Sequence, residues 1–378
     1  MSADTRAGRG LAAMWTRARS GAALPLLLKD EALRDWEVKR AWPGRAGELV
    51  VELHAMQDGQ TVQQITAGRI FADGTHAIDP PGTDPRLNSL SRFAADGQVI
   101  VHRRGKRAVV RRGEGSYVKV VRRNQAEELA DQSRLAAKLT AGTGFQAPRL
   151  LRVADDWIEH AELPGTSLLQ LGMSNASVGQ WRAVWEQWAN AWPRFVAGGR
   201  EKLTTAVWPP LHDALREAEL LDNAVRKAIA FDVFPVPTER LNLAAGRIID
   251  ALLRGESDQH VIAHRDLHDK QILVQPGPVG EVPIGLLDFD TTARSEAALD
   301  LANLAVHLEF RYAQGLLSAE RWRIGRRAID SACAALDVTP SRFVAYSDAT
   351  RLRMACLYAY RPRWAGLAVG RILELCRK

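Results

Sequence analysis

The segment that decides the fold spans residues 264–290 and reads HRDLHDKQILVQPGPVGEVPIGLLDFD. It places Asp266 in an H-x-D loop, Gln271 five residues later, and the carboxylates of Asp288 and Asp290 after an apolar strand. Phosphoryl transfer needs one carboxylate that orients and deprotonates a hydroxyl, and oxygen ligands that hold Mg²⁺ against nucleotide phosphates. The segment therefore predicts kinase-type chemistry.

Features on both sides of this segment occur in a fixed order. Lys119 lies in the strand-like stretch YVKV, Leu163-Pro164-Gly165 is typical of a hinge, and the ALDLA stretch that contains Asp300 begins a helix. With these features, residues 97–365 resemble the aminoglycoside phosphotransferase family of the protein-kinase-like superfamily. The resemblance implies an α+β, two-lobed protein-kinase-like fold, with a small antiparallel-sheet N-lobe, a mainly helical C-lobe and an N-terminal extension.

The resemblance also implies ATP and Mg²⁺ as cofactors and assigns roles to individual residues. Asp266 would act as a general base toward the acceptor hydroxyl. Asp288 would bind Mg²⁺ with Gln271 as the second ligand, and Asp290 could serve as a further metal or water ligand. Lys119 would pair with the α and β phosphates of ATP.

Two residues depart from the family pattern. Gln271 stands where Asn is usual; it offers the same amide oxygen on a stem one methylene longer, and Mg²⁺ tolerates poor octahedral geometry badly. Arg265 stands where Gly is usual, and we expect it to brace the loop by pairing with a carboxylate. We expect His264 to be a packed framework residue, and Asp300 resembles the buried helix Asp that anchors the catalytic loop in the family.

The nucleotide side has weaker signals. No GxGxxG motif is present, so the phosphate-covering turn is placed at residues 103–107, where Gly105 and Lys106 would meet phosphates; a solvated hairpin tip is the alternative. Glu127 fits a capping box that starts at Asn124, so Glu128 is the predicted partner of Lys119. The hinge at residues 159–162 would bind adenine through its backbone.

The pattern along the chain predicts three parts. Residues 1–95 form an extension of mixed structure, with a helix at 10–19 and a hairpin at 49–70 that turns at Asp58-Gly59. Residues 96–162 form the N-lobe, with three strands in 98–122 and a helix that runs to about Leu139. Residues 163–378 form the helical C-lobe, in which residues 272–289 form a short hairpin.

Tryptophans repeat at helical spacing in one segment of the C-lobe, at Trp181, Trp185, Trp188 and Trp192. They could form a wall that binds a sugar, but packing of an amphipathic helix is the better interpretation. The three cysteines, Cys333, Cys356 and Cys376, have neither metal-site nor disulfide spacing. We expect reduced thiols.

The net charge of +7 is unevenly distributed: +6 over residues 1–160, −6 over 161–300 and +7 over 301–378. The basic stretch at residues 101–123 falls where ATP phosphates would bind. Phosphate binding therefore explains the positive charge, and we do not expect a nucleic-acid partner. The basic C-terminal part favours a neutral or anionic acceptor over an aminoglycoside, although the acidic middle part leaves polycations open. No stretch has the length of a membrane span, and we expect a cytoplasmic protein with no membrane partner.

The function that these features predict is an ATP-dependent phosphotransferase acting on a hydroxyl of a small molecule. The departure at Gln271 and the unclear partner of Lys119 leave a second hypothesis open, a nucleotide-binding regulator of the pseudokinase type with little transfer activity. Protein phosphorylation rests on Arg265 alone, and no APE motif of an activation loop is present. The sequence predicts neither the acceptor nor the oligomeric state.

Overall fold

The computed structural model describes residues 24–113, 115–202, 209–275 and 282–377, with only the backbone given for 199–202. The helix predicted at residues 10–19 lies outside the described residues. Within the described ranges, no helix combines the length and the apolar character needed to cross a membrane.

The extension is built on a five-stranded antiparallel sheet whose strands follow the chain order. Trp36, Leu49 and Leu53 are buried in it because alternate residues of each strand face inward. Asp58 and Gly59 both have positive φ, as the predicted two-residue hairpin turn requires. The strands are β1 (Leu27–Lys29), β2 (Asp35–Pro43), β3 (Leu49–Gln57), β4 (Gln60–Ile70) and β5 (His76–Ile78).

A second five-stranded antiparallel sheet forms the N-lobe in the order β10-β11-β8-β7-β6. The three strands predicted for residues 98–122 are present, and the short helix α2 precedes them. The capping box at Asn124 is wrong: helix α3 begins at Ala126, no side chain caps it, and Asn124 has φ of 64°. The elements are α2 (Leu90–Asp96), β6 (Gly97–Arg103), β7 (Arg107–Arg112), β8 (Ser116–Val121), α3 (Ala126–Thr140), β10 (Leu150–Ala154) and β11 (Trp157–Ala161).

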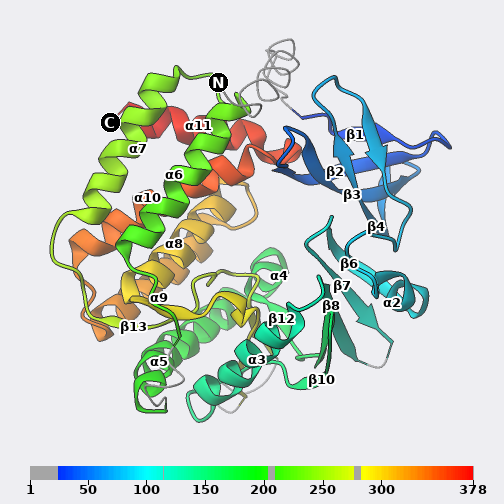
Figure 1. Cartoon of the computed structure of the whole chain (residues 1–378). Helices are drawn as coiled ribbons and strands as arrows, with labels where there is room; N and C mark the ends of the chain where they lie inside the picture. The colour runs from blue at the N-terminus through cyan, green and yellow to red at the C-terminus, as the bar shows by residue number, and fades with distance from the viewer. Residues whose placement is uncertain (1–23, 114, 203–208, 276–281, 378) are drawn as a thin grey trace.

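The C-lobe is mainly helical, as predicted (Figure 1). Its central helix α8 is apolar on nearly all sides because neighbouring helices cover it. The helices are α4 (Leu168–Met173), α5 (Val178–Lys202), α6 (Ala214–Ala230), α7 (Thr238–Leu253), α8 (Ala297–Ala313), α9 (Ala319–Ala335), α10 (Pro340–Tyr358) and α11 (Ala365–Leu375). The cysteines are free, with Cys356 buried and the other two half-buried.

The four tryptophans of α5 are core residues, which confirms the packing interpretation. Each is at most 1% exposed, and successive ring centroids lie 5.5–5.8 Å apart. The indole of Trp181 donates to the carbonyl of Arg321 at 2.9 Å. A sugar-binding wall would need accessible ring faces, so these rings hold α5 against the rest of the lobe instead.

The hairpin predicted at residues 272–289 is present as β14 (Ile272–Val274) and β15 (Ile284–Leu286), which pair antiparallel. Strands β9 (Phe145–Gln146) and β12 (Thr166–Ser167) flank the pair. The predicted hinge glycine, Gly165, has φ of 133°, and a Cβ there would come within 2.9 Å of the Val274 carbonyl oxygen. The chain can therefore pass from the N-lobe alongside β14 only with glycine at this position.

The N-terminal sheet contacts both lobes (Figure 1). On the N-lobe side, the buried carboxylate of Glu52 accepts the backbone N–H of His102 at 3.0 Å. On the C-lobe side, the backbone N–H of Ala41 donates to the carbonyl of Tyr360 at 2.7 Å. The extension is therefore hydrogen-bonded to both lobes. The predicted domain boundaries at residues 95 and 162 stay predictions.

Candidate active site

The catalytic-type loop begins where the short strand β13 (His260–Ala263) ends, and a buried carboxylate fixes its first turn. Asp300, on the first turn of α8, accepts the backbone N–H groups of His264 at 2.6 Å and Arg265 at 2.8 Å. It is 2% exposed, and burial raises its pKa to about 7. The anchoring contact that the resemblance implied for Asp300 is therefore present.

Arg265 explains why glycine is usual at its position. It has φ of 68°, a left-handed conformation that is costly for any residue with a Cβ. The expected pairing of its side chain with a carboxylate is wrong, because the guanidinium donates to the Thr291 carbonyl at 3.3 Å instead. Arg265 thus braces the loop through two hydrogen bonds. Its guanidinium donates to the Thr291 carbonyl, and its backbone N–H donates to the Asp300 carboxylate.

His264 is a framework residue, as expected. It is fully buried, its Nε2 lies 2.7 Å from the carbonyl oxygen of Leu287, and its Nδ1 accepts the backbone N–H of Asp266. Burial lowers its pKa, so the ring is neutral, with Nε2 donating to that carbonyl. His264 therefore fixes the backbone of Asp266 relative to the strand that leads to Asp288.

The Asp266 side chain faces the space between the lobes and is 45% exposed. Surrounding protein atoms and the neighbouring Asp288 charge raise its pKa to about 6. The Nε2 atom of His268 lies 3.9 Å from its Oδ1. A carboxylate in this position is accessible to an acceptor, and its pKa lies close to neutral pH. Both properties suit a general base.

Asp288 and Asp290 face Lys119 across the cleft between the lobes. The Lys119 ammonium, on β8, donates to Asp288 at 3.0 Å and to Asp290 at 2.6 Å. Arg107 lies 3.6 Å from Asp290. Although burial opposes the effect, the charges of Lys119 and Arg107 hold the pKa of Asp288 well below its usual range. Burial and the Asp288 charge instead raise the pKa of Asp290. The pair thus concentrates carboxylate oxygens where the Lys119 cation is already accommodated.

The donors around this pair fit Mg²⁺. The Gln271 side-chain amide lies 3.4 Å from the second oxygen of Asp288, and rotating that amide by half a turn directs its oxygen to the same point. Carboxylate and amide oxygens are the ligands that Mg²⁺ prefers. The longer side chain of Gln271 therefore still reaches the position that a metal ligand needs.

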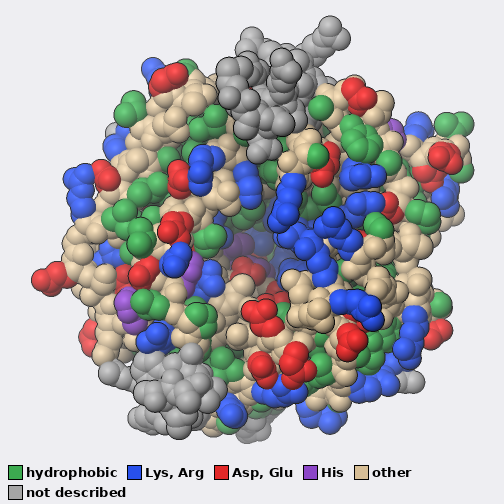
Figure 2. All heavy atoms as spheres, in the orientation of Figure 1, with side chains coloured by type: hydrophobic (Ala, Val, Ile, Leu, Met, Phe, Trp, Pro, Cys, Tyr) green, Lys and Arg blue, Asp and Glu red, His purple; other side chains and the backbone are tan. Residues whose placement is uncertain are grey.

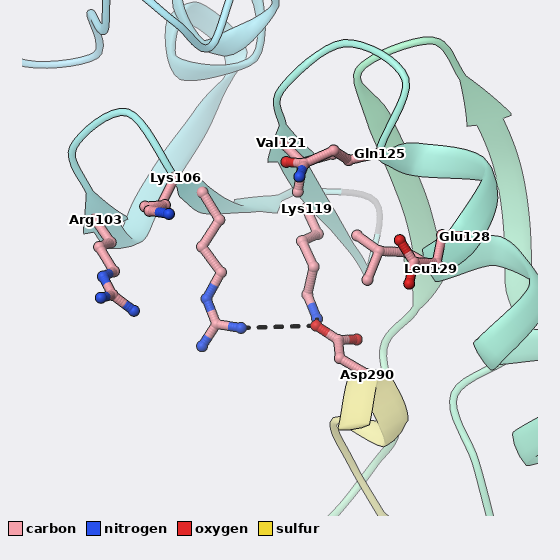
Figure 3. Close-up of a pocket in the computed structure, with 9 residues that line it drawn as sticks. Arg103, Lys106, Lys119, Val121, Gln125, Glu128, Leu129 and Asp290 are labelled. Atoms are coloured by element: carbon pink, nitrogen blue, oxygen red, sulfur yellow. Dashed lines mark hydrogen bonds and ion pairs between the residues drawn. The ribbon is translucent and has the colours of Figure 1, made fainter. Parts of the chain in front are cut away.

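A cavity of about 290 Å³ opens beside these carboxylates (Figure 3). Three of the four residues predicted for nucleotide binding, Lys106, Lys119 and Glu128, line it together with Asp290. Basic side chains of the β6–β7 turn form one side of the cavity and the start of α3 forms the other. The complete lining is Arg103, Lys106, Arg107, Lys119, Val121, Gln125, Glu128, Leu129 and Asp290.

Gly105 and Glu128 take less direct positions than expected. The backbone N–H of Gly105 donates to Asp84 at 2.7 Å and is therefore not available to a phosphate. The side chains of Arg103, Lys106 and Arg107 are the contacts that this turn makes with the cavity. Glu128 lines the cavity, but among the described residues only Asp288 and Asp290 form ion pairs with Lys119. Glu127 pairs with Arg134 on the helix surface.

Sequence reasoning missed His160, on β11. Its Nε2 lies 2.8 Å from the Ser133 hydroxyl, and burial, with the charge of Lys119, lowers its pKa to about 4. Nothing in the local sequence marks it, since its environment comes from α3 and β8. Arg107 belongs to the predicted turn, but the sequence did not predict its contact with Asp290. That contact forms only when the N-lobe and the C-lobe are folded against each other.

His160 gives a pH-dependent prediction for stability. Its pKa is about 4 in the folded protein against 6.5 ordinarily, so its stabilising contribution is complete above pH 6.5 and is lost as the pH falls toward 4. The free energy of unfolding should fall between pH 7 and pH 5 in the wild type. We expect this fall to be smaller by about 1 kcal/mol in His160→Gln. Denaturant unfolding at both pH values measures this, with exposed His260→Gln as the control. An unchanged difference would contradict the assignment.

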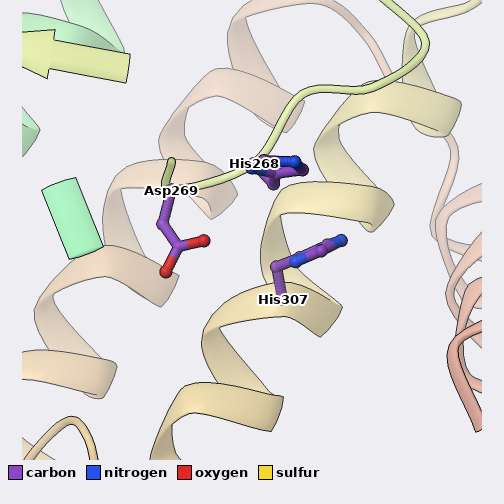
Figure 4. A group of neighbouring side chains, drawn as sticks. All are labelled: His268, Asp269 and His307. Atoms are coloured by element: carbon purple, nitrogen blue, oxygen red, sulfur yellow. The ribbon is translucent and has the colours of Figure 1, made fainter. Parts of the chain in front are cut away.

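His268, Asp269 and His307 lie close together and resemble a metal-ligand group (Figure 4). However, both oxygens of Asp269 accept from the buried guanidinium of Arg311, at 2.8 and 3.2 Å. The Nδ1 atom of His268 accepts the backbone N–H of Lys270. These contacts occupy both oxygens of Asp269 and one ring nitrogen of His268, whereas the buried Nδ1 atom of His307 has no hydrogen-bond partner in the described part of the chain.

Comparison with solved structures identifies the fold. An aminoglycoside-3'-phosphotransferase of type VIII matches 70% of this chain and 98% of its own, with a TM-score of 0.50 and 16% sequence identity. The aminoglycoside phosphotransferase APH(3'')-Id from Streptomyces rimosus matches 71% of this chain and 96% of its own, with a TM-score of 0.49 and 21% identity. The macrolide 2'-phosphotransferase MphH from Brachybacterium faecium matches 73% of this chain and 89% of its own, with a TM-score of 0.44 and 16% identity.

The first of these matches confirms the predicted two-lobed, kinase-like fold of the aminoglycoside phosphotransferases. No family model matches the sequence, and no curated protein matches it. At 16% identity the likeness concerns the fold, and function has to be argued from the site.

Proposed function

We propose that this protein is an ATP-dependent phosphotransferase that moves the γ-phosphate to a hydroxyl of a small molecule. The observation that carries the proposal is the meeting of Lys119, from the N-lobe, with Asp288 and Asp290 in the cleft where Asp266 is exposed. Residues more than 140 positions apart in the chain form one charged constellation. His264, two residues before Asp266, is held by hydrogen bonds with the Asp300 carboxylate and the Leu287 carbonyl. Such preorganisation is what phosphoryl transfer demands of a protein.

In the proposed mechanism Asp266 accepts a hydrogen bond from the acceptor hydroxyl, aligns its oxygen with the γ-phosphorus and takes its proton. Its pKa of about 6 leaves it mostly ionised at neutral pH and able to accept that proton. Lys119, released from the two carboxylates, binds the α and β phosphates. Asp288, Gln271 and Asp290 would hold Mg²⁺, which supplies positive charge against the phosphate oxygens.

A nucleotide-binding regulator is the second candidate, favoured by one observation. Lys119 is held by both carboxylates, and no helix α3 glutamate pairs with it in the part of the chain that the structure describes. If nucleotide binding leaves this ion pair intact, the site binds without catalysing transfer. Incubation with Mg-ATP and a panel of sugars, aminoglycosides and hydroxy acids, with products detected by mass spectrometry, separates the two. Nucleotide binding without any phosphorylated product would support the regulator.

The Gln271 departure gives a prediction for metal dependence. We expect Gln271→Leu to lower transfer about 10-fold or more and to raise the Mg²⁺ concentration needed for half-maximal rate, since a metal ligand is lost. Gln271→Asn keeps the amide oxygen and should stay within a few-fold of the wild type. Titration of Mg²⁺ at saturating ATP measures both variants. Equal Mg²⁺ dependence in Gln271→Leu and the wild type would show that the amide is not a ligand.

A further inference from the structure

The turn between β6 and β7, residues 103–107, forms the basic side of the nucleotide cavity, and the N-terminal extension holds it in place. Figure 2 shows Lys and Arg side chains gathered on the side of the central hollow that lies toward the N-terminal sheet and the N-lobe. Arg103, Lys106 and Arg107 of this turn line the cavity. In Figure 3, Arg103 and Lys106 lie on one side of Lys119, and the start of α3 lies on the other. The contacts that shape this turn therefore bear on how the cavity binds phosphate.

The backbone of the turn is tied to the segment that leads from the N-terminal sheet to α2. Asp84 accepts the backbone N–H of Gly105 at 2.7 Å, and the same oxygen lies 3.0 Å from Nε2 of His102. The side chains of Asp84 and His102 have no exposed surface. Arg104 donates to both oxygens of Asp79, at 2.5 and 3.2 Å. Three positions of the β6–β7 hairpin are thus bound to these two aspartates, so the extension sets the shape of the turn before any nucleotide arrives.

A tryptophan of the extension holds the first arginine of the turn. The Arg103 guanidinium lies over the ring of Trp42, from β2, at 4.8 Å from its centroid. A cation at this distance is attracted to the face of an indole ring. Arg107 lies 3.6 Å from Asp290, but Arg103 and Lys106 form no ion pair with a carboxylate among the described residues. The charges of Arg103 and Lys106 are therefore available to an anion in the cavity.

The backbone N–H groups at the tip of the turn are not available to phosphate. Glycine-rich phosphate loops bind phosphate oxygens through N–H groups of this kind. Here the N–H of Gly105 is bound to Asp84, and that of Lys106 donates to the Arg103 carbonyl at 2.9 Å. The Gly105 carbonyl accepts from the guanidinium of Arg122 at 2.6 Å. Phosphate binding at this turn is therefore left to charged side chains, and the extension determines where those side chains lie.

We propose that the N-terminal extension is part of the nucleotide site: Trp42 and Asp84 position the β6–β7 turn so that its side chains, Arg103 above all, bind the nucleotide phosphates. This inference rests on the nucleotide binding that the proposed function requires, and it adds a role for the extension. Trp42 and Asp84 are positioning residues, because neither lines the cavity and both act through the turn. Interactions between charged side chains and phosphates are screened by salt, so the affinity for ATP should fall as the ionic strength rises.

Binding of a non-hydrolysable ATP analogue with Mg²⁺, and of adenosine alone, separates the phosphate contribution from that of the base and ribose. Calorimetry measures the first ligand and ligand-observed NMR the second, both on the full chain. We expect Trp42→Leu to weaken binding of the analogue about 5-fold or more and to leave adenosine binding unchanged. Trp42→Phe keeps an aromatic ring under Arg103 and should stay within about 3-fold of the wild type. Phe71→Leu is the matched control, since it removes the ring under Arg69, which does not line the cavity.

A double-mutant cycle shows whether Trp42 acts through Arg103. Arg103→Gln should weaken binding of the analogue about 10-fold, and adding Trp42→Leu to it should weaken binding no further. Asp84→Asn keeps the shape of the side chain and removes its charge, so it should weaken binding of the analogue about 5-fold and leave adenosine binding unchanged. Because Asp84 is buried, Lys106→Gln at the exposed tip of the turn adds a variant that leaves the fold intact, and it should also weaken binding of the analogue alone.

Additive losses from Trp42→Leu and Arg103→Gln, an equal loss for adenosine, wild-type affinity in every one of these variants, or no binding of the analogue by the wild type would each overturn the proposal. These readouts involve no turnover. Loss of phosphate-dependent binding in the variants of a protein that phosphorylates no acceptor would refute only the phosphotransferase function. Transfer by a wild type whose variants all bind the analogue normally would refute only the role of the extension.

Discussion

Replacing Asp266 with Asn is expected to lower phosphoryl transfer about 10²–10⁴-fold, the contribution typical of a positioned general base. Asn has the same shape, so the loop held by His264 and Asp300 stays in place. The amide cannot take the hydroxyl proton. It is also neutral, so it no longer repels the negative charge of Asp288. The loss should therefore appear in kcat, with KM for ATP changed little, because Asp266 does not line the nucleotide cavity.

The measurement is the rate of ADP formation and of phosphorylated product in the acceptor panel, together with the affinity for Mg-ATP of each variant. Asp222→Asn, at an exposed position of α6, is the matched control and should behave as the wild type. Transfer by Asp266→Asn within about threefold of the wild type would remove Asp266 as the base. A parallel loss of ATP binding would instead indicate that the substitution disturbs the fold of the site.

Asp300→Ala is expected to reduce the free energy of unfolding by about 2–6 kcal/mol, because two buried backbone N–H groups lose their acceptor. One of these groups belongs to Arg265, whose left-handed backbone at φ of 68° needs a fixed partner. We expect the surviving folded protein to lose transfer activity as well, since the turn that presents Asp266 is no longer held. Chemical denaturation followed by tryptophan fluorescence measures the first effect, because the α5 tryptophans are buried.

Two further variants make this prediction specific. Asp250→Ala removes an exposed carboxylate that pairs with Arg254, and it should change the free energy of unfolding by less than about 1 kcal/mol. Arg265→Gly relieves the left-handed conformation and loses only the contact with Thr291, so it should be far milder than Asp300→Ala. A stability loss in Asp300→Ala no greater than in Asp250→Ala would show that the loop is held by other contacts.

The chemistry-bearing motifs were readable in the sequence because each depends on a short stretch. Asp266, Gln271, Asp288 and Asp290 fall in one segment of 27 residues, and the hairpin between them follows from apolar strands and turn residues. The Trp repeat of α5 was assigned to the core from its spacing alone, and the structure bears this out. Local patterns of this kind are set by neighbouring residues, so no tertiary information is needed to recognise them.

The errors arise at residues whose partners depend on the folded structure. The sequence matches a capping box at Asn124 and Glu127. In the structure, Asn124 has a left-handed backbone, and Glu127 forms an ion pair with Arg134 on the exposed side of α3. Arg265 was expected to meet a carboxylate and meets a carbonyl. In each case the residue type was compatible with several partners, and the packing of other segments chose among them.

By itself, the sequence determined the two-lobed fold, the segment that carries the proposed catalytic residues and the likeness to phosphotransferases. Only the tertiary structure brought Lys119 to the two carboxylates and placed the extension against both lobes. The physical reason is range: strand and turn preferences act over a few residues, whereas the carboxylate partners of Lys119 come from a segment 169 and 171 residues further along the chain.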